Sequence, residues 1–204
     1  MTLQLFYSPG SCSLSPHIAL REAGLHFELV RVDLRAKRTA SDVDFLSINP
    51  KGYVPALLLG DGELITEGAI IVQYIADQVP DARLAPRAGT PERRRLQEWL
   101  HFIATELQKG ISPLNNPKAN DELKAALRPK LDSRFALLSR ALRDRPYLLG
   151  NDFSVADGYA YYVLRSLRKL DPEALQRDET LLAYFQRLEA RPAIQSALTA
   201  EGLL

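Results

Sequence analysis

The residue best suited to chemistry is the only cysteine, Cys12, in the stretch YSPGSCSLSPH between a Pro-Gly turn and the expected start of a helix. Backbone N–H groups at a helix start lack intrahelical partners and the dipole favours an anion, so a thiol there can ionise near neutral pH. A thiolate is a nucleophile, a redox-active group and a metal ligand. A buried, inert cysteine is the alternative, and position alone leaves both interpretations open.

The rest of the sequence narrows the chemistry of this thiol. Ser15 stands where a C-x-x-C motif would have its second cysteine, which excludes a dithiol oxidoreductase. A lone cysteine can still exchange with an external thiol. The three histidines, His17, His26 and His101, have no acidic or cysteine partners at ligand spacing, so we expect no metal site.

Two further short motifs could bind a ligand. Proline cannot donate to a strand ladder, so Val54-Pro55 at the opening of a hairpin strand is unusual. A cis bond would turn the backbone of Val54 outward to pair with a peptide-like ligand, and a plain edge-strand proline is the alternative. In TEGA, Glu67 and the N–H of Gly68 suit the two charges of a zwitterion, in a helix expected to have Thr66 as N-cap. An ordinary acidic first turn is the alternative there.

Composition limits the class of protein. The chain has 204 residues, of which 46% are hydrophobic and 25% charged, with a formal net charge of +1. These values are ordinary for a folded globular protein and give no global field that favours nucleic acid or an anionic membrane. No apolar run approaches the roughly 20 residues of a membrane span, and MTLQLFYSPG does not read as a signal peptide. We therefore expect a cytoplasmic protein with no nucleic-acid or membrane partner.

The secondary structure predicted to position these residues differs between the first and the second part of the chain. Up to about residue 79 the pattern predicts the order βαβ-α-ββα, with a hairpin of PALLL and ELIT near its end and a short helix capped by Ser41 before it. This is the order of a thioredoxin-like α/β domain, although periodicity alone does not separate it from other small α/β sheets. After a Pro- and Gly-rich linker every segment is predicted to be helical. The first helix has Thr90 as N-cap before Pro91 and continues to about residues 109–110, and a later helix begins at the capping signature SVAD. We expect domains at 1–80 and 90–204, joined by a linker at 81–89.

Several segments together resemble one family. They are LFYSPGSCSLSPHIALREAG, NPKGYVPALLL, LITEGAIIVQYIAD, EWLHFIATELQKG, FSVADGYAYYVLR and ARPAIQSALTAEGLL. In this order they resemble the bacterial beta-class glutathione transferases of the cytosolic superfamily, from end to end of the chain. The resemblance implies a thioredoxin-like domain, an all-α domain forming the wall of the electrophile site, and a detoxifying homodimer. Glutathione between the two domains would be a co-substrate for a small electrophile, and no cofactor is implied.

The resemblance also implies the site residues. Cys12 is placed beside the glutathione sulfur, and Val54 pairs its backbone with the cysteinyl part, before a cis Pro55. Glu67 and Gly68 hold the γ-glutamyl end. The remaining glutathione-binding residues implied by position are Lys37 for the glycyl carboxylate and, after the linker, His101, Thr105, Glu106, Leu107 and Gln108.

Two positions depart from the family pattern. Relatives commonly have His where this chain has Gln108, and Gln can hydrogen-bond a thiol but cannot titrate near neutral pH. A catalytic role of Gln108 is therefore expected to differ from that of the histidine. His101 stands where relatives often have Asn, and it either substitutes in part, contacts the neighbouring subunit's glutathione, or is an interface histidine.

The sequence supports one main hypothesis and two rivals. The main one is an enzyme that transfers glutathione to electrophiles, with Cys12 either positioning glutathione or forming a mixed disulfide in thiol-transferase or reductive dehalogenase chemistry. The first rival is a non-catalytic carrier of glutathione or apolar ligands on the same fold. The presence of Gln108 in place of the family's common histidine favours this rival. The second is an interaction scaffold without affinity for glutathione.

Overall fold

The computed structural model describes residues 2–116 and 118–204, which fall into two compact units. The first unit joins the chain up to Ala85 to Pro192–Leu204, and the second is Pro86–Arg191. Along the described residues, no helix is long and apolar enough to cross a membrane.

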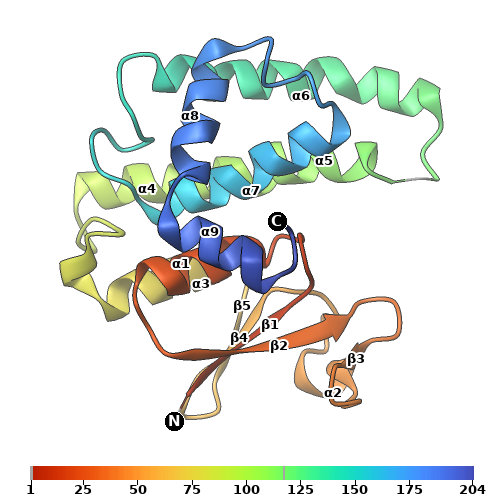
Figure 1. The fold of residues 1–204 in the computed structure, drawn as a ribbon, viewed down its shortest axis with the longest axis vertical. Helices are drawn as coiled ribbons and strands as arrows, with labels where there is room; N and C mark the ends of the chain where they lie inside the picture. Colours follow the sequence, from red (N-terminus) through yellow and green to blue (C-terminus); the bar gives the residue numbers. More distant parts are fainter. Residues whose placement is uncertain (1, 117) are drawn as a thin grey trace. The chain divides into compact units, whose positions relative to one another are not determined.

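The first unit is an α/β domain built on a five-stranded mixed sheet (Figure 1). Its elements are β1 (Leu3–Tyr7), α1 (Leu14–Glu22), β2 (Phe27–Asp33), β3 (Arg38–Thr39), α2 (Phe45–Ile48), β4 (Ala56–Leu58), β5 (Leu64–Thr66), α3 (Gly68–Gln78), the 3₁₀ turn η1 (Pro80–Ala82) and α9 (Pro192–Ala200). The strand order is β3-β2-β1-β4-β5, with β1 and β2 parallel and the other neighbours antiparallel. This confirms the predicted thioredoxin-like arrangement.

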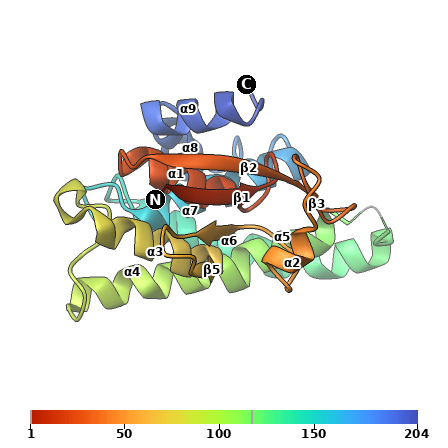
Figure 2. The same cartoon turned by 90° about the horizontal axis from the view of Figure 1, so that it is seen from below.

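Alternation along β1 sends side chains to both faces of the sheet. Phe6 joins a buried cluster with Val32, Phe45 and Val54, and the rings of Phe6 and Phe45 lie 5.6 Å apart. Phe45 belongs to α2, which lies beside β3 in both views (Figures 1 and 2). On the other face, the ring of Tyr7 lies near His17 of α1. The sheet is thus covered on both faces, which fixes the ends of its central strands.

The predicted N-cap of the short helix α2 is wrong. The N-cap of α2 is Asp44, whose carboxylate accepts from the N–H of Leu46 at 3.0 Å, and Ser41 lies outside the helix. The short strand β3 takes up the segment before it, where Thr39 Oγ1 accepts from the N–H of Val43. That hydroxyl also pairs with Ser41, so the helix starts later than the sequence pattern indicates.

The units also differ from the expected domain boundaries. The helical domain was expected to run from 90 to 204, whereas α9 and the last residues belong to the first unit. The reason is direct contact: α9 packs against α1, and the carboxylate of Glu201 is buried beside His17. The C-terminal segment therefore completes the α/β domain.

The second unit is entirely helical. Its elements are α4 (Pro91–Phe102), the π-helical segment η2 (Ile103–Gln108), α5 (Lys109–Leu114), α6 (Asp121–Leu142), α7 (Val155–Leu170) and α8 (Glu179–Glu189). Thr90 caps α4 as predicted, accepting from the N–H of Arg93 at 3.1 Å. The helix predicted to continue to residues 109–110 does so through η2, so its last turns are wider than those of an α-helix.

The capping box predicted from SVAD begins α7 and is fully buried. Asp157 accepts from the N–H and the hydroxyl of Ser154, each at 2.8 Å. It also accepts from the N–H of Leu148 at 2.9 Å and the hydroxyl of Tyr184 at 2.6 Å. Burial raises the pKa of Asp157, and these donors offset part of that effect. One carboxylate therefore joins α7 to α8 and to the segment before α7.

Candidate functional site

The sheet register brings three predicted motifs to one end of the first unit. Phe6 pairs with Ala56, and Ala56 pairs with Thr66, so these three residues lie side by side in one row across β1, β4 and β5. The segment carrying Cys12 follows β1, Pro55 precedes Ala56, and Glu67 follows Thr66. Residues far apart in sequence therefore meet at the same edge because the strands that carry them are paired.

The thiol directly contacts the second motif. The S–H of Cys12 donates to the carbonyl oxygen of Val54, with 3.2 Å between sulfur and oxygen. The Val54-Pro55 bond is cis, as the resemblance implies. Cys12 is half-buried and lies just before α1, and its own carbonyl accepts from the N–H of Ser15. Two of the predicted site residues, Cys12 and Val54, are thus in direct contact.

Serines hold the loop that presents the thiol. Ser13 Oγ accepts from the N–H of Ser8 at 3.2 Å and lies 2.8 Å from Ser11 Oγ. The N–H of Ser11 donates to the carbonyl of Ser8 at 3.1 Å. Gly10 has φ +68°, a conformation that side chains rarely adopt, which explains a glycine in this turn. The loop therefore has one defined shape.

Glu67 occupies an unusual backbone position at the start of α3. Its φ is +71°, in the left-handed region, and it is the N-cap residue in place of the predicted Thr66. Such a conformation in a residue other than glycine costs about 1–3 kcal/mol and is often found where function requires it. The carboxylate projects to the surface, and Gly68 begins the helix beside it.

Two residues that the sequence analysis missed contact this carboxylate. The hydroxyl of Tyr53 donates to Glu67 Oε1 at 2.8 Å, and Lys51 Nζ lies 3.6 Å from the same oxygen. Lys51 Nζ also donates to Thr66 Oγ1 at 2.7 Å. The hydrogen bond to Glu67 raises the pKa of Tyr53. The signal in the sequence is the spacing K-x-Y immediately before Val54, which places both side chains on the loop that enters β4.

Lys37 lies in the same unit and is fixed by the backbone around it. It has φ +56°, and its Nζ donates to the carbonyl of Gly52 at 2.6 Å. Gly52 itself has φ +66°, and a Cβ there would lie 2.9 Å from the side chain of Leu46. Lys37 therefore presents its charge on the loop that leads to Val54.

These groups can hold a short zwitterionic peptide with a thiol. The Val54 backbone offers peptide hydrogen bonds, Glu67 offers a negative charge to an ammonium, and Lys51 and Lys37 offer positive charges to carboxylates. The Cys12 thiol lies against the Val54 carbonyl, where a ligand paired with that backbone would bring its own sulfur. Among the described residues no cluster of three or more His, Cys, Asp or Glu could hold a metal ion.

The predicted residues of the helical unit lie on η2 or just before it. Thr105 Oγ1 donates to the carbonyl of His101 at 2.8 Å, and His101 Nδ1 lies 2.8 Å from the carbonyl of Gln97. Glu106 pairs with Arg134 at 2.7 Å, which lowers the pKa of Glu106. The side chain of Leu107 is fully buried, so only its backbone is available to a ligand.

Gln108 is held by an aromatic side chain. The hydroxyl of Tyr159 on α7 donates to Gln108 Oε1. Since this bond uses the oxygen, the amide N–H₂ group of Gln108 is the part that can donate to a ligand. A histidine at this position would meet the same hydroxyl, and the exchange to Gln removes a group that titrates near neutral pH.

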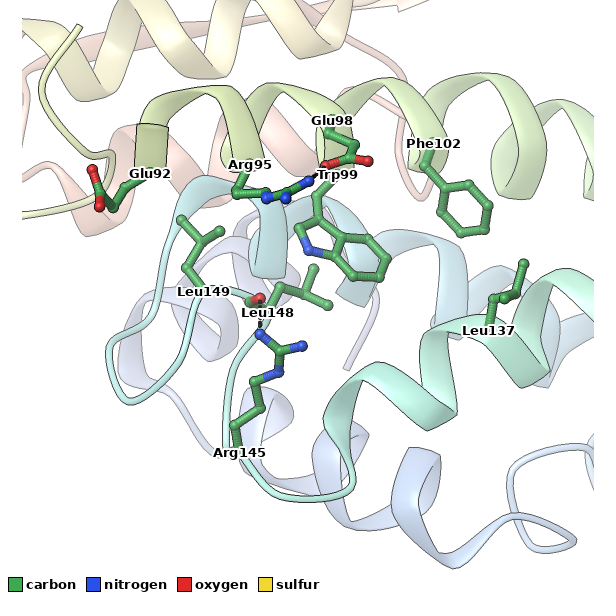
Figure 3. Close-up of a pocket in the computed structure, with 9 residues that line it drawn as sticks. All are labelled: Glu92, Arg95, Glu98, Trp99, Phe102, Leu137, Arg145, Leu148 and Leu149. Carbon is green, nitrogen blue, oxygen red and sulfur yellow. Dashed lines mark hydrogen bonds and ion pairs between the residues drawn. The ribbon is translucent and has the colours of Figure 1, made fainter. Parts of the chain in front are cut away.

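Two cavities of the helical unit were compared with these positions. The larger, about 480 Å³, lies between α4, α6 and the segment after α6 and is shown in Figure 3. Its lining residues are Glu92, Arg95, Glu98, Trp99, Phe102, Leu137, Arg145, Leu148 and Leu149, and none of them is a predicted site residue. The smaller, about 200 Å³, is lined by Thr105 and Glu106 of η2 together with residues of α5 and α6. Of the predicted residues, Thr105 and Glu106 thus line the smaller cavity.

Comparison with known families and proteins gives a consistent result over the whole chain. The family model described as glutathione S-transferase, N-terminal domain, matches residues 1–77, and the C-terminal domain model matches residues 102–192. The chain is 46% identical over 203 residues to glutathione S-transferase GstA of Escherichia coli O157:H7. That match covers 98% of this chain and 100% of GstA.

Solved structures agree with the sequence comparison. The ternary complex of BphK, a bacterial GST, is 55% identical with a TM-score of 0.95, covering 98% of this chain and 100% of BphK. A Sphingomonad glutathione S-transferase complexed with glutathione is 45% identical with a TM-score of 0.94, over the same shares of the two chains.

Proposed function

Because the chain belongs to the glutathione S-transferase family, in its bacterial beta class, we propose that it binds glutathione along the Val54 backbone with the glutathione sulfur beside Cys12. The observation that carries this proposal is the contact between Cys12 Sγ and the Val54 carbonyl at 3.2 Å. Val54 then pairs with the cysteinyl part of the tripeptide. Glu67 takes the γ-glutamyl ammonium, the N–H of Gly68 takes its carboxylate, and Lys37 takes the glycyl carboxylate.

The first reaction is transfer of glutathione to a small electrophile. The glutathione thiolate attacks an electrophilic carbon, a carbon–sulfur bond forms, and the leaving group departs with its electron pair. Backbone and hydroxyl donors near the start of α1 stabilise the sulfur anion before attack. For the helical unit we propose, from the family resemblance, that His101, Thr105, the Leu107 backbone and the amide of Gln108 are the glutathione-binding groups, and Glu106 is held by Arg134.

The second reaction uses Cys12 as a nucleophile. Its thiolate attacks the glutathione sulfur of a mixed disulfide, so that a Cys12–glutathione disulfide forms and the substrate thiol leaves. A second glutathione then attacks this disulfide, releasing oxidised glutathione and restoring the Cys12 thiol. No metal or other cofactor takes part in either reaction.

We also propose a homodimer and a cytoplasmic location. A reducing compartment keeps glutathione and the Cys12 thiol in the form that both reactions need. Sedimentation of the purified protein at micromolar concentration tests the assembly, and a monomer at every concentration would contradict it. The comparisons do not favour the carrier hypothesis, because the full-length relative at 46% identity is a glutathione S-transferase.

Calorimetric titration of reduced protein with glutathione tests the binding proposal. We expect a dissociation constant from micromolar to low millimolar, and no detectable heat across that range would overturn the assigned site. The Cys12→Ala variant then separates the two reactions. Its thiol-transferase turnover should fall by about a hundredfold or more, because the nucleophile is lost. Transfer to an electrophilic carbon should be affected much less, and unchanged thiol-transferase turnover would rule out the covalent step.

A further inference from the structure

The loop that presents Cys12 is tied to the last residues of the chain. The N–H of Gly10 donates to Glu201 Oε2 at 2.8 Å, across 191 positions of sequence. Figure 1 shows the end of the chain, in blue, beside the red loop that follows β1. Gly10 lies two residues before the thiol, so the backbone of the thiol loop depends on a carboxylate from beyond α9.

The same carboxylate also holds the start of α1. Glu201 Oε1 lies 2.9 Å from His17 Nδ1, and both side chains are completely buried. The other ring nitrogen of His17 accepts from Arg21 Nε at 3.3 Å. Since an arginine can only donate, His17 carries its proton on Nδ1 and donates it to Glu201. Each oxygen of Glu201 therefore has its own donor, one from the thiol loop and one from α1.

The end of α9 is shaped to deliver this carboxylate. Gly202 has φ +68°, and the N–H of Leu203 donates to the carbonyl of Leu198 at 2.9 Å, so the chain turns back directly after Glu201. A Cβ on Gly10 would lie 3.4 Å from the side chain of Leu203. The thiol loop is therefore contacted on the same side by the charge of Glu201 and the packing of Leu203.

We propose that Glu201 is a positioning residue for the Cys12 thiol, acting through the Gly10 amide and through His17. Burying a carboxylate at a helix end costs desolvation free energy, whereas an apolar side chain would fill the same space without that cost. Its two hydrogen bonds join the two segments that flank Cys12, which are the loop before it and the helix after it. Small displacements of a reacting group have large effects on rate, so fixing both flanks matters for the sulfur. The proposal rests on the function proposed for Cys12.

The first experiment is Glu201→Gln, read out by the rate at which iodoacetamide alkylates Cys12 without glutathione. The glutamine amide would place its N–H₂ group against one of the two donors, so one flank of the thiol loses its bond. We expect alkylation and thiol-transferase turnover to fall by about fivefold or more, in protein that remains folded. An alkylation rate within about twofold of the parent would overturn the proposal.

Matched variants separate positioning from general loss of stability. Ile194→Val removes one buried methylene group from the same helix and leaves both bonds of Glu201 in place. It should keep the parent alkylation rate, and a fall equal to that of Glu201→Gln would show a merely structural role. Arg21→Gln changes an exposed side chain that donates to His17 and lies over the ring of Phe27 without contacting Glu201, and it should give an intermediate fall. That variant keeps the proposal testable if Glu201→Gln does not fold.

The alkylation assay also distinguishes failure of the positioning role of Glu201 from failure of the proposed function. It needs no glutathione, so it tests the effect of Glu201 on the thiol even if the calorimetric titration finds no binding. Normal glutathione binding with an unchanged alkylation rate in Glu201→Gln would refute only the positioning role. Absence of glutathione binding to the parent protein would refute the proposed function.

Discussion

At the scale of single residues, Tyr53 and Lys51 contact the same oxygen of Glu67 but differ in what they contribute. The ion pair with Lys51 is between side chains that are each about half exposed, and such pairs contribute little to stability. The Tyr53 hydroxyl makes a directional bond of 2.8 Å to the carboxylate. It therefore sets the orientation in which Glu67 meets an ammonium group.

The Tyr53→Phe variant tests this orientation. Loss of the hydroxyl should raise the KM for glutathione about three- to tenfold, the equivalent of one hydrogen bond to a charged group, with kcat changed less. Steady-state kinetics with glutathione as the varied substrate measure both. Tyr74→Phe on α3 is the matched control and should leave the KM unchanged. Equal KM values for parent and Tyr53→Phe would show that the Tyr53 hydroxyl does not orient the Glu67 carboxylate for glutathione binding.

At the scale of elements, hydrogen-bonded caps fix where helices begin. The sequence predicts some of these caps correctly and others not. Thr90 and the Ser154–Asp157 box were predicted because a capping side chain is followed by residues that suit a first turn. The cap of α2 was assigned to Ser41 because β3, only two residues long, leaves no periodic signal. At α3 the cap is Glu67 with a positive φ, a backbone conformation that residue type alone does not reveal.

The π-helical segment η2 shows a second limit of sequence patterns. Ile103 and Leu107 are spaced as in an α-helix and are both buried, so periodicity predicts an unbroken helix. The wider turn is a property of backbone hydrogen bonds, which the side-chain pattern does not record. The position of the predicted residues Thr105–Gln108 on one short segment could be inferred from sequence, but their local geometry could not.

The buried capping box gives a prediction at this scale. Asp157→Asn should lower the free energy of unfolding by about 2–4 kcal/mol, because four donors lose a charged acceptor and the two on one of its oxygens would face an N–H₂ group. Urea unfolding followed by circular dichroism measures the loss. The matched control is Asp178→Asn at the half-buried N-cap of α8, where asparagine caps about as well as aspartate and the expected loss is only about 0.5 kcal/mol or less. Equal effects of the two variants would mean that burial adds nothing to the Asp157 network.

At the scale of the whole molecule, a network of charges joins distant parts of the helical unit. Asp171, which ends α7, pairs with Arg128 of α6 at 2.6 Å and closely with Arg177. Arg128 first, and then Arg177, lowers the pKa of Asp171 from 3.8 to about 2. The folded protein therefore binds fewer protons than the unfolded chain between these values, and stability must fall as pH falls through this range.

Acid unfolding tests this contribution. It should be fully present above about pH 4 and lost as the pH falls toward about 2, and Asp171→Asn should remove on the order of 1 kcal/mol at neutral pH. Urea midpoints between pH 2 and 7 measure the difference between parent and variant, which should shrink at the acid end. Asp144→Asn, in the exposed segment after α6, is the control. A difference that stays constant with pH would contradict a role for the Asp171 charge.

The sequence predicted the two-part organisation but not the place of the last helix. Composition and periodicity identify α9 as a helix, and nothing in them distinguishes a helix of the second unit from one that returns to the first. The deciding contacts join Glu201 to Gly10 and His17, about 190 positions apart, and such pairs have no local signature. The buried partner of His17 could not be inferred from the sequence.

The return of α9 also determines the order in which the chain can mature during synthesis. A ribosome releases the β-strands first and α9 last, and between them it makes the whole helical unit of residues 86–191. Domains fold as units as they emerge, so the helical unit can close while the thiol loop still lacks Glu201. The unit that is begun first is thus completed after the helical unit, and a nascent chain acquires its complete Cys12 loop only once Glu201 has been made and released.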